Sequence, residues 1–253
     1  MKCLIENLKG KVAVVTGASS GIGESLTKML AQKNVKVYAV ARRKDRLANL
    51  ASTNKNIIPV VQDVTKELTA LKEIIKDKKI DILVNNAGGA LGKDPIQDAP
   101  KDKWLGMIER NVTGLIEISQ LIIPKMIKQG SGDVINVGSI AGLQPYSGGA
   151  VYCGSKAMVR FMSEAWQQDL IGKGIRVMII NPGLVETEFS IVRFDGDKEA
   201  ADKVYENMDP LTAEDVAQNI VWMLAQPKHV NLMSVTIMPT HQPSATMVWR
   251  ERR

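Results

Sequence analysis

The chain has 253 residues, of which 45% are hydrophobic and 24% are charged, values that suit one globular α/β domain and argue against a disordered chain. Its formal charge of +6 does not indicate nucleic-acid binding, because the basic residues are interspersed with acids, and a positive surface that gathers an anionic cofactor is the simpler interpretation. No stretch approaches the roughly 18 apolar residues that span a membrane, so no membrane partner is expected.

Residues 1–10 carry an acid, Glu6, and no long apolar run, so no signal peptide is expected. Cys3 and Cys153 are too few for a disulfide framework, and they do not have zinc-ligand spacing. We therefore expect a cytoplasmic protein with no metal site.

Seven short runs rich in β-branched residues alternate with longer amphipathic stretches. They predict strands at residues 12–16, 35–40, 57–61, 80–85, 133–137, 175–181 and 234–238. Helical periodicity is clearest at residues 23–33 and 68–75. This alternation predicts a single-domain, doubly wound Rossmann fold over residues 1–253, with a seven-stranded parallel sheet and helices on both faces. Ligands of such sheets bind beyond the carboxyl ends of the strands.

A glycine-rich turn, Gly17-x-x-x-Gly21-x-Gly23, follows the first strand and opens a helix. Glycines let the backbone approach a pyrophosphate, whose charge is stabilised at the helix N-terminus. A plain strand-to-helix turn is the alternative, because the spacing differs from Gly-x-Gly-x-x-Gly. The predicted phosphate-binding residues are Gly17, Ser19, Ser20, Gly21, Ile22 and Gly23.

Arg42 and Arg43 follow the second strand, where a site selective for NAD places an acid that holds the ribose 2′-hydroxyl. Two guanidinium groups instead suit a 2′-phosphate, so the sequence predicts NADP as the cofactor. The alternative is a solvated basic helix start, although helix N-termini favour acids.

Polar and small residues also follow the third and fourth strands. Asp63, followed by Val64, could hold the adenine amino group or could serve only as a helix N-cap. The run Asn86-Ala87-Gly88 is expected at the same edge of the sheet.

Ser139, Tyr152 and Lys156 form the predicted catalytic group. Tyr152 and Lys156 are four residues apart and therefore share one face of a helix. A nearby cation stabilises a phenolate and lowers its pKa, which would make Tyr152 a usable acid or base. Ser139 could hydrogen-bond the substrate oxygen as charge develops on it.

Asn111 could connect water and Lys156 in a proton relay, which would complete a group of four. Each of these residues also has a structural interpretation: Tyr152 in a helix face, Lys156 in solvent, Ser139 in a turn and Asn111 inside a helix. Their joint occurrence, in order behind a glycine turn, favours catalysis.

Residues 182–210 are the longest irregular region and lie at the cofactor edge of the sheet. We expect a mobile substrate lid within residues 184–210. Thr212 and Asp215 have capping-box character and mark the start of the next helix.

These motifs, with Asn85-Asn86-Ala87-Gly88 and Pro182-Gly183, resemble the short-chain dehydrogenase/reductase family from Lys11 to about Gln242. The resemblance implies a catalytic tetrad of Asn111, Ser139, Tyr152 and Lys156. It also implies contacts of Tyr152 and Lys156 with the nicotinamide ribose, and of Asn86 with the adenosine ribose. By the same resemblance, the carboxamide end of the cofactor is held by Pro182, Gly183, Val185 and Thr187.

Residues 145–152 and 182–197 resemble the NADP-dependent 3-hydroxy acid dehydrogenases more narrowly, a group that includes serine and allo-threonine dehydrogenases and is commonly homotetrameric. The substrate end would then include Ser139, Tyr146 and Arg193. The tail at residues 244–253 falls outside this resemblance. The resemblance therefore does not support subunit contacts that depend on the end of the chain.

A 3-hydroxy acid needs a cation near its carboxylate, and Arg193 is the best candidate. The alternative is that Arg193 pairs with Asp195 or Asp197. The leading hypothesis is NADP-linked oxidation of a small 3-hydroxy acid or reduction of its 3-oxo counterpart. A broad carbonyl reductase or secondary-alcohol dehydrogenase is the alternative, and a dinucleotide sensor without turnover is a remote one.

Overall fold

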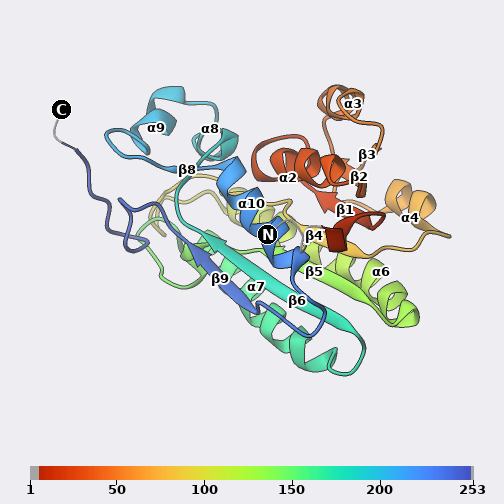
Figure 1. Ribbon diagram of the computed structural model, residues 1–253. Coiled ribbons are helices and arrows are strands. Elements are labelled where there is room, and N and C mark those ends of the chain that lie inside the picture. The colour runs from red at the N-terminus through yellow and green to blue at the C-terminus, as the bar shows by residue number, and fades with distance from the viewer. Residues whose placement is uncertain (1–5, 252–253) are drawn as a thin grey trace.

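Seven strands form one parallel sheet in the computed structural model, which describes residues 6–251 (Figure 1). Their order across the sheet is β3-β2-β1-β4-β5-β6-β9. The strands are β1 (Val12–Thr16), β2 (Lys36–Ala41), β3 (Ile57–Val61), β4 (Ile82–Asn85), β5 (Gly132–Val137), β6 (Ile175–Pro182) and β9 (Ser234–Ile237). The predicted seven-stranded parallel sheet is confirmed, because buried β-branched runs have few alternatives to a sheet covered on both faces.

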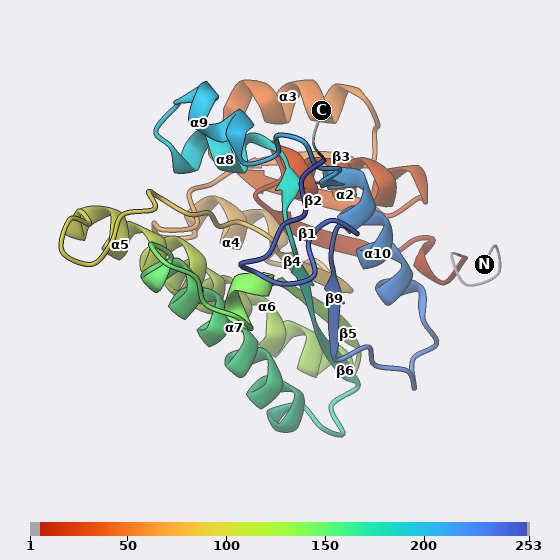
Figure 2. The same cartoon turned by 90° about the vertical axis from the view of Figure 1, so that its left-hand side faces the viewer.

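Helices cover the sheet on both faces (Figures 1 and 2). One hydrophobic core packs the sheet against α2 (Gly21–Gln32), α3 (Lys44–Ser52) and α10 (Ala213–Ala225). The other packs it against α4 (Thr69–Ile75), α6 (Gly114–Gln129) and the carboxyl end of α7 (Ala150–Asp169). A further helix, α5 (Lys101–Ile108), packs on α7.

The strand order reverses between β1 and β4, which are neighbours in the sheet but far apart in sequence. The Thr16 hydroxyl joins the two strand ends by accepting from the amides of Asn86 at 3.0 Å and Ala87 at 2.9 Å. Chain segments leaving β1 and β4 diverge on opposite faces, and this geometry opens a crevice for a ligand.

The segment from residue 182 to 210 is more ordered than the sequence predicts. It contains β7 (Val185–Glu186), α8 (Glu188–Arg193) and α9 (Lys198–Lys203), and β7 pairs with β8 (Leu211–Thr212). Thr187 caps α8 and Asp197 caps α9 through their side-chain oxygens. The expectation of an irregular region was wrong, because such short helices depend on local caps and tertiary packing rather than on periodicity.

The predicted capping box at the start of α10 is confirmed. The Thr212 hydroxyl accepts from the Asp215 amide at 3.1 Å, and the Asp215 carboxylate accepts from the Thr212 amide at 2.8 Å. Three short turns of other helix types complete the described elements: η1 (Glu6–Leu8), the π-helix η2 (Glu109–Thr113) and the 3-10 helix η3 (Ile140–Gly142).

Cys153 is a buried free thiol, whereas Cys3 lies outside the described residues. Within residues 6–251, no helix is long and apolar enough to cross a membrane. In the same range, no group of three or more His, Cys, Asp or Glu side chains could hold a metal ion.

Candidate active site

A cavity of about 820 Å³ lies at the carboxyl ends of the strands. Nearly all the residues predicted from the sequence line it: Gly17, Ser19, Ser20, Gly21, Ile22, Arg42, Arg43, Asp63, Val64, Asn86, Ala87, Gly88, Ser139, Tyr146, Tyr152, Lys156, Pro182, Gly183, Val185, Thr187 and Arg193. Gly23 and Asn111 do not line the cavity; they contact residues that do.

The glycine turn is closed tightly around its own backbone. Gly17 and Gly21 have φ angles of 65° and 52°, which lie in the left-handed region that residues with a Cβ atom rarely adopt. A Cβ atom on Gly23 would collide with the Gly17 carbonyl oxygen and would lie 2.5 Å from Asn86 Nδ2. The turn can therefore bring backbone amides to the cavity only with glycine at these positions.

The Asn86 side chain stabilises this turn through hydrogen bonds to its backbone. Its side-chain amide donates to the carbonyl oxygens of Thr16 at 2.9 Å and Gly17 at 3.4 Å. The helix that follows, α2, begins without a side-chain cap from Ser20. Its first turn therefore presents uncapped backbone amides and the positive end of the helix dipole, an arrangement suited to a phosphate.

Arg43 reaches across the mouth of the glycine turn. Its guanidinium donates to the Ser19 hydroxyl at 3.1 Å, to the Ser20 hydroxyl at 2.7 Å and to the Glu188 carboxylate on α8 at 2.9 Å. Arg46 on α3 shares the same carboxylate at 2.5 Å. Glu188 and Arg46 were not predicted as parts of this cluster, because only the tertiary fold brings the start of α8 within ion-pair distance of α3.

Arg42 points to the adenine end predicted for the cavity, with its guanidinium 3.9 Å from the Asp63 carboxylate. Partial burial raises the pKa of Asp63, but the Thr65 amide and hydroxyl and the Arg42 charge outweigh it and hold that pKa below its ordinary value. Asp63 does not cap the next helix, which starts at Thr69 with Leu68 as its N-cap. The N-cap alternative for Asp63 was therefore wrong.

Arg110 is a further cation at this end of the cavity that the sequence analysis missed. Burial lowers the pKa of its half-buried guanidinium, as does the Arg42 charge, while Asp63 acts in the opposite direction. Its position directly before Asn111 was the only signal, and the sequence alone gives no reason to turn it toward Asp63.

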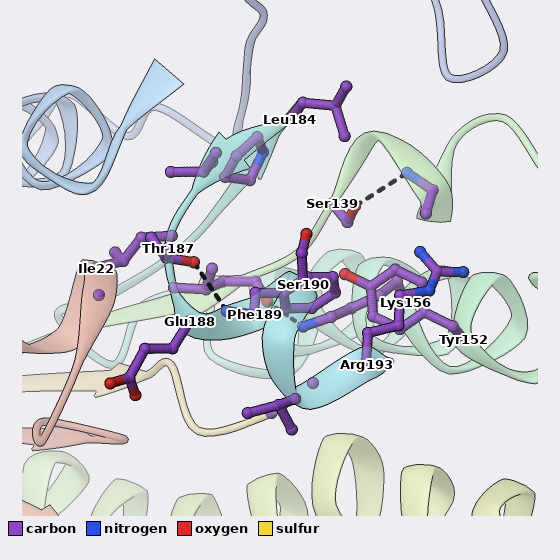
Figure 3. A pocket seen from close by; sticks show the side chains of 18 of the residues that line it. Ile22, Ser139, Tyr152, Lys156, Leu184, Thr187, Glu188, Phe189, Ser190 and Arg193 are labelled. Atoms are coloured by element: carbon purple, nitrogen blue, oxygen red, sulfur yellow. Dashed lines mark hydrogen bonds between the residues drawn. The ribbon is translucent and has the colours of Figure 1, made fainter. Parts of the chain in front are cut away.

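Ser139 and Tyr152 meet at the opposite end of the cavity, where Figure 3 shows them with Lys156 and Arg193. The Ser139 hydroxyl accepts from the Ala141 amide at 3.1 Å, and its proximity to the Tyr152 hydroxyl lowers the pKa of that phenol. The Phe189 ring, carried by α8, packs edge-on to Tyr152 with ring centroids 5.7 Å apart. Phe189, like Glu188, Arg46 and Arg110, was not predicted as a site residue.

The expected lowering of the Tyr152 pKa by Lys156 is not what the structure gives. Burial raises the pKa of Tyr152 well above its ordinary value, against the Ser139 hydrogen bond and the Arg193 charge, which lower it. Burial also lowers the pKa of Lys156 to about 8. The Lys156 ammonium donates to the Val137 carbonyl at 2.8 Å, so desolvation outweighs the pairing that the spacing suggested.

Asn111 lies in the π-helix η2 and connects two parts of the site. Its side chain donates to the Gly89 carbonyl at 2.9 Å and to the Ser155 hydroxyl on α7 at 3.0 Å, and it accepts from the Gly89 amide at 2.8 Å. A Cβ atom on Gly88 would lie 2.9 Å from Asn111 Oδ1 and 3.6 Å from Lys156 Nζ. Asn111 therefore positions the Gly88-Gly89 turn beside Lys156.

Arg193 faces the cavity from the end of α8. Its Nε donates to the Gly92 carbonyl at 3.1 Å, and its guanidinium carbon lies 5.3 Å from the centroid of the Tyr146 ring. Its Nη2 atom is buried and has no hydrogen-bond partner among the described residues. A lining residue of the cavity thus carries a buried guanidinium nitrogen whose hydrogen-bonding capacity is not used by the described residues.

The ion-pair alternative for Arg193 was wrong. Asp195 pairs with Lys103 at 2.5 Å, and Asp197 caps α9 by accepting from the Ala200 amide at 3.0 Å. Both carboxylates are thus committed to other groups.

A glycine turn at a strand-order reversal, with a buried Ser-Tyr-Lys group at the other end of the same cavity, defines a dinucleotide-linked oxidoreductase. A family model described as short chain dehydrogenase matches residues 11–198, and the chain belongs to that family.

Within the family, the chain is similar to proteins of known name. The serine 3-dehydrogenase of Agrobacterium fabrum is 42% identical over 246 residues, covering 94% of this chain and 98% of its own. The NADP-dependent 3-hydroxy acid dehydrogenase of Schizosaccharomyces pombe is 38% identical over 259 residues, covering 98% of this chain and 100% of its own. A structure of the closed form of serine dehydrogenase complexed with NADP+ superposes with a TM-score of 0.90 at 40% identity, covering 95% of this chain and 100% of the other.

Proposed function

We propose that this enzyme transfers a hydride between NADP and a small 3-hydroxy acid or its 3-oxo counterpart. The observation that carries the proposal is the unpartnered, buried Nη2 of Arg193 in the cavity that also holds Tyr152 and Ser139. A carboxylate two carbons from the reacting carbon would satisfy this guanidinium through charge-assisted hydrogen bonds. The names of the similar enzymes support the same substrate class.

The residues present fit NADP. The glycine turn would hold the pyrophosphate, Arg42 and Arg43 the 2′-phosphate, and Asp63 with Val64 the adenine. Asn86, Ala87 and Gly88 would line the adenosine side, and Tyr152, Lys156, Pro182, Gly183, Val185 and Thr187 the nicotinamide side. Three cations at one end of the cavity and its glycine-lined phosphate turn support this assignment.

When bound, the nicotinamide supplies or accepts the hydride at C3 of the substrate. Tyr152 exchanges the proton of the substrate oxygen through its hydroxyl, and Ser139 hydrogen-bonds the same oxygen. Because burial raises the pKa of Tyr152, the phenol is protonated at neutral pH and is poised to donate in the reductive direction. In the oxidative direction, the charge of Arg193, which lowers the pKa of Tyr152, favours the phenolate. Asn111 positions the neighbouring turn and, with it, Lys156.

The test is Arg193→Ala, assayed by nicotinamide absorbance with 3-hydroxybutanoate and with 2-butanol, which lacks the carboxylate. We expect kcat/KM for the acid to fall about 10- to 100-fold, because a charge-assisted hydrogen bond is lost, with little change for the alcohol. Equal losses for both substrates would make Arg193 structural and favour a broad carbonyl reductase. No turnover by the wild-type enzyme of any acid or alcohol with either cofactor would favour a dinucleotide sensor.

We further propose that residues 184–210 act as the substrate lid. Phe189 and Arg193 on α8 lie over the Ser139-Tyr152 end of the cavity, whereas Glu188 points away toward Arg43 (Figure 3). The lid would thereby connect the 2′-phosphate site to the substrate site. Cutting of this segment by trypsin, which can cleave after Lys198 and Lys203, should slow when NADP is added.

A homotetramer is proposed from the outer face of α5 and α7. Leu105 and Ile108 on α5 are 54% and 41% exposed, and Met158 and Phe161 on α7 are 46% and 60% exposed. Exposed apolar side chains on two helices that pack together favour an interface. Phe161→Glu should lower the mass measured by light scattering, whereas Ile96→Glu, at an exposed residue outside α5 and α7, should not.

The cytoplasm is the proposed location. The buried free thiol of Cys153 is stable in a reducing compartment, and fractionation of cells with an antibody against the chain would test the proposal.

A further inference from the structure

Residues 244–250, here called the C-terminal tail, cross the outer end of the cavity. Thr246, Val248 and Arg250 line it. The tail follows β9 and runs up toward α9 (Figure 1). It is anchored at its start by the buried side chain of Gln242, which accepts from the Leu184 amide at 2.7 Å.

The tail is joined to the proposed lid. The Arg250 guanidinium donates to the Val204 carbonyl at 3.0 Å and to the Glu206 carbonyl. The Glu251 amide donates to the Asn207 carbonyl at 2.9 Å. These carbonyls follow α9, so the contacts attach the tail to the carboxyl end of α9.

The tail is also joined to the opposite side of the cavity mouth. The Ala245 amide donates to the Gln144 side chain at 2.9 Å, on the turn after η3. Ser139, which belongs to the catalytic group, caps the start of η3. The tail therefore spans the mouth from the catalytic side to the lid side.

Internal contacts give the tail a defined shape. The Trp249 amide donates to the His241 carbonyl at 2.8 Å, and their rings pack edge-on with centroids 4.8 Å apart. The Ser244 hydroxyl accepts from the Met247 amide at 3.1 Å. A segment folded in this way presents fixed side chains to the cavity.

We propose that the C-terminal tail is the outer wall of the substrate compartment, and that Thr246 and Val248, held in place by Arg250, limit the length of the substrate chain beyond the reacting carbon. This inference rests on the proposed function, because it assigns a specificity wall to the same site. Val248 and Thr246 would exclude long substrates by filling the space that the longer chain would need. Arg250 is then a positioning residue, because it holds these two side chains in place and does not contact the substrate itself.

Two substitutions test the wall in opposite directions. Arg250→Ala releases the tail, and Val248→Trp enlarges the wall. The measured quantity is the ratio of kcat/KM for 3-hydroxyoctanoate to that for 3-hydroxybutanoate with NADP. We expect the ratio to rise about tenfold in Arg250→Ala and to fall about tenfold in Val248→Trp, which is the size of effect that added methylenes have in an apolar pocket. Lys228→Ala removes one exposed charge elsewhere and should leave the ratio unchanged.

Arg250→Lys separates positioning from charge. The lysine keeps the positive charge but cannot donate to two carbonyls at once. A loss in Arg250→Ala that is equal for both acids and is restored by lysine would overturn the proposal in favour of electrostatic attraction. An unchanged ratio in both Arg250→Ala and Val248→Trp would also overturn it.

The test is independent of the carboxylate assignment. The same ratio can be measured for 2-octanol and 2-butanol. Turnover of alcohols but not of acids would refute the 3-hydroxy acid proposal, and the ratio for the two alcohols would still test whether the tail limits substrate length. Hydrogen exchange of residues 198–209 needs no substrate, and it should speed up in Arg250→Ala but not in Lys228→Ala. Faster exchange with an unchanged ratio for both pairs would show that the tail holds the lid without setting specificity, which would refute the wall.

Discussion

Tyr152 is 7% exposed and lies among groups that disfavour its phenolate, while the ammonium of Lys156, one helical turn away, donates to a backbone carbonyl. Both groups are desolvated by burial, which raises the pKa of Tyr152 and lowers the pKa of Lys156. The two pKa values thus move apart rather than toward a matched acid and base. A dinucleotide beside them would change this balance by bringing its own charge.

Tyr152→Phe removes the hydroxyl that exchanges the proton and leaves the ring against Phe189. We expect kcat to fall by about 10²- to 10⁴-fold, the usual contribution of a positioned acid or base. The Kd for NADPH, measured by fluorescence titration, should change by less than about threefold. A near-normal kcat would remove Tyr152 from the reaction.

Arg43 tests the basis of cofactor choice. Arg43→Ala should raise the Kd for NADPH about 10- to 100-fold, because charge-assisted bonds to a phosphate are lost, and should change the Kd for NADH far less. Arg46→Ala is the matched control, since Arg46 shares Glu188 with Arg43 but does not line the cavity. Equal weakening of both cofactors by Arg43→Ala would mean that this arginine only holds the lid.

At the scale of elements, the turn between β1 and α2 and the helix α8 carry the two ends of the site. The turn is rigid because Asn86 and Thr16 bond its backbone, whereas α8 has only six residues and a single side-chain cap. Glu188, at the start of α8, joins it to Arg43 and Arg46. Partial burial raises the pKa of Glu188, but both arginines outweigh it and hold that pKa below its ordinary value, so this link persists to a lower pH than an unperturbed glutamate would allow.

Gly23→Ala tests the turn as an element. The added Cβ would collide with the Gly17 carbonyl, so the turn must open and its amides must move. We expect the Kd for NADPH to rise at least about tenfold, together with a lower melting temperature.

Gly154→Ala is the control for Gly23→Ala. Gly154 lies within α7, where a Cβ meets nothing within 4 Å. Alanine there should stabilise the helix by about 0.5–1 kcal/mol and leave cofactor binding intact. Equal effects of the two substitutions on cofactor binding would show that the turn does not need glycine at position 23.

At the scale of the whole molecule, folding buries a charged lysine beneath the active site, and this carries a stability cost that depends on pH. Because the pKa of Lys156 falls to about 8 on folding, the unfolded chain binds more protons between pH 8 and 10. The free energy of unfolding contributed by this group therefore rises with pH across that window.

Lys156→Met removes this cost. At pH 7 the variant should gain up to about 3 kcal/mol in the free energy of unfolding from the absence of the buried charge, offset in part by the lost bond to Val137. Between pH 8 and 10 this advantage should shrink, because the free energy of unfolding of the wild-type enzyme rises with pH there. Urea unfolding of both proteins across this range measures the difference. Lys228→Met should show no such pH dependence, and a constant difference for Lys156→Met would contradict the buried charge.

The seven parallel strands, the glycine turn, the spacing of Tyr152 and Lys156 and the capping box of α10 were all predictable from the sequence. Each depends on neighbours within a few residues: an apolar run that must be buried on both faces, a backbone angle that needs glycine, or a helix period that places two side chains on one face.

Only the tertiary structure decided how distant groups combine. Residues 145 apart, Arg43 and Glu188, form an ion pair because α8 returns to the edge of α3. Arg110 turns toward Asp63, Phe189 packs on Tyr152, and the tail at Arg250 closes over α9. Burial also set the pKa values of Tyr152 and Lys156. Desolvation and contacts across the chain depend on what the whole fold brings to a point in space, and local sequence patterns do not contain that information.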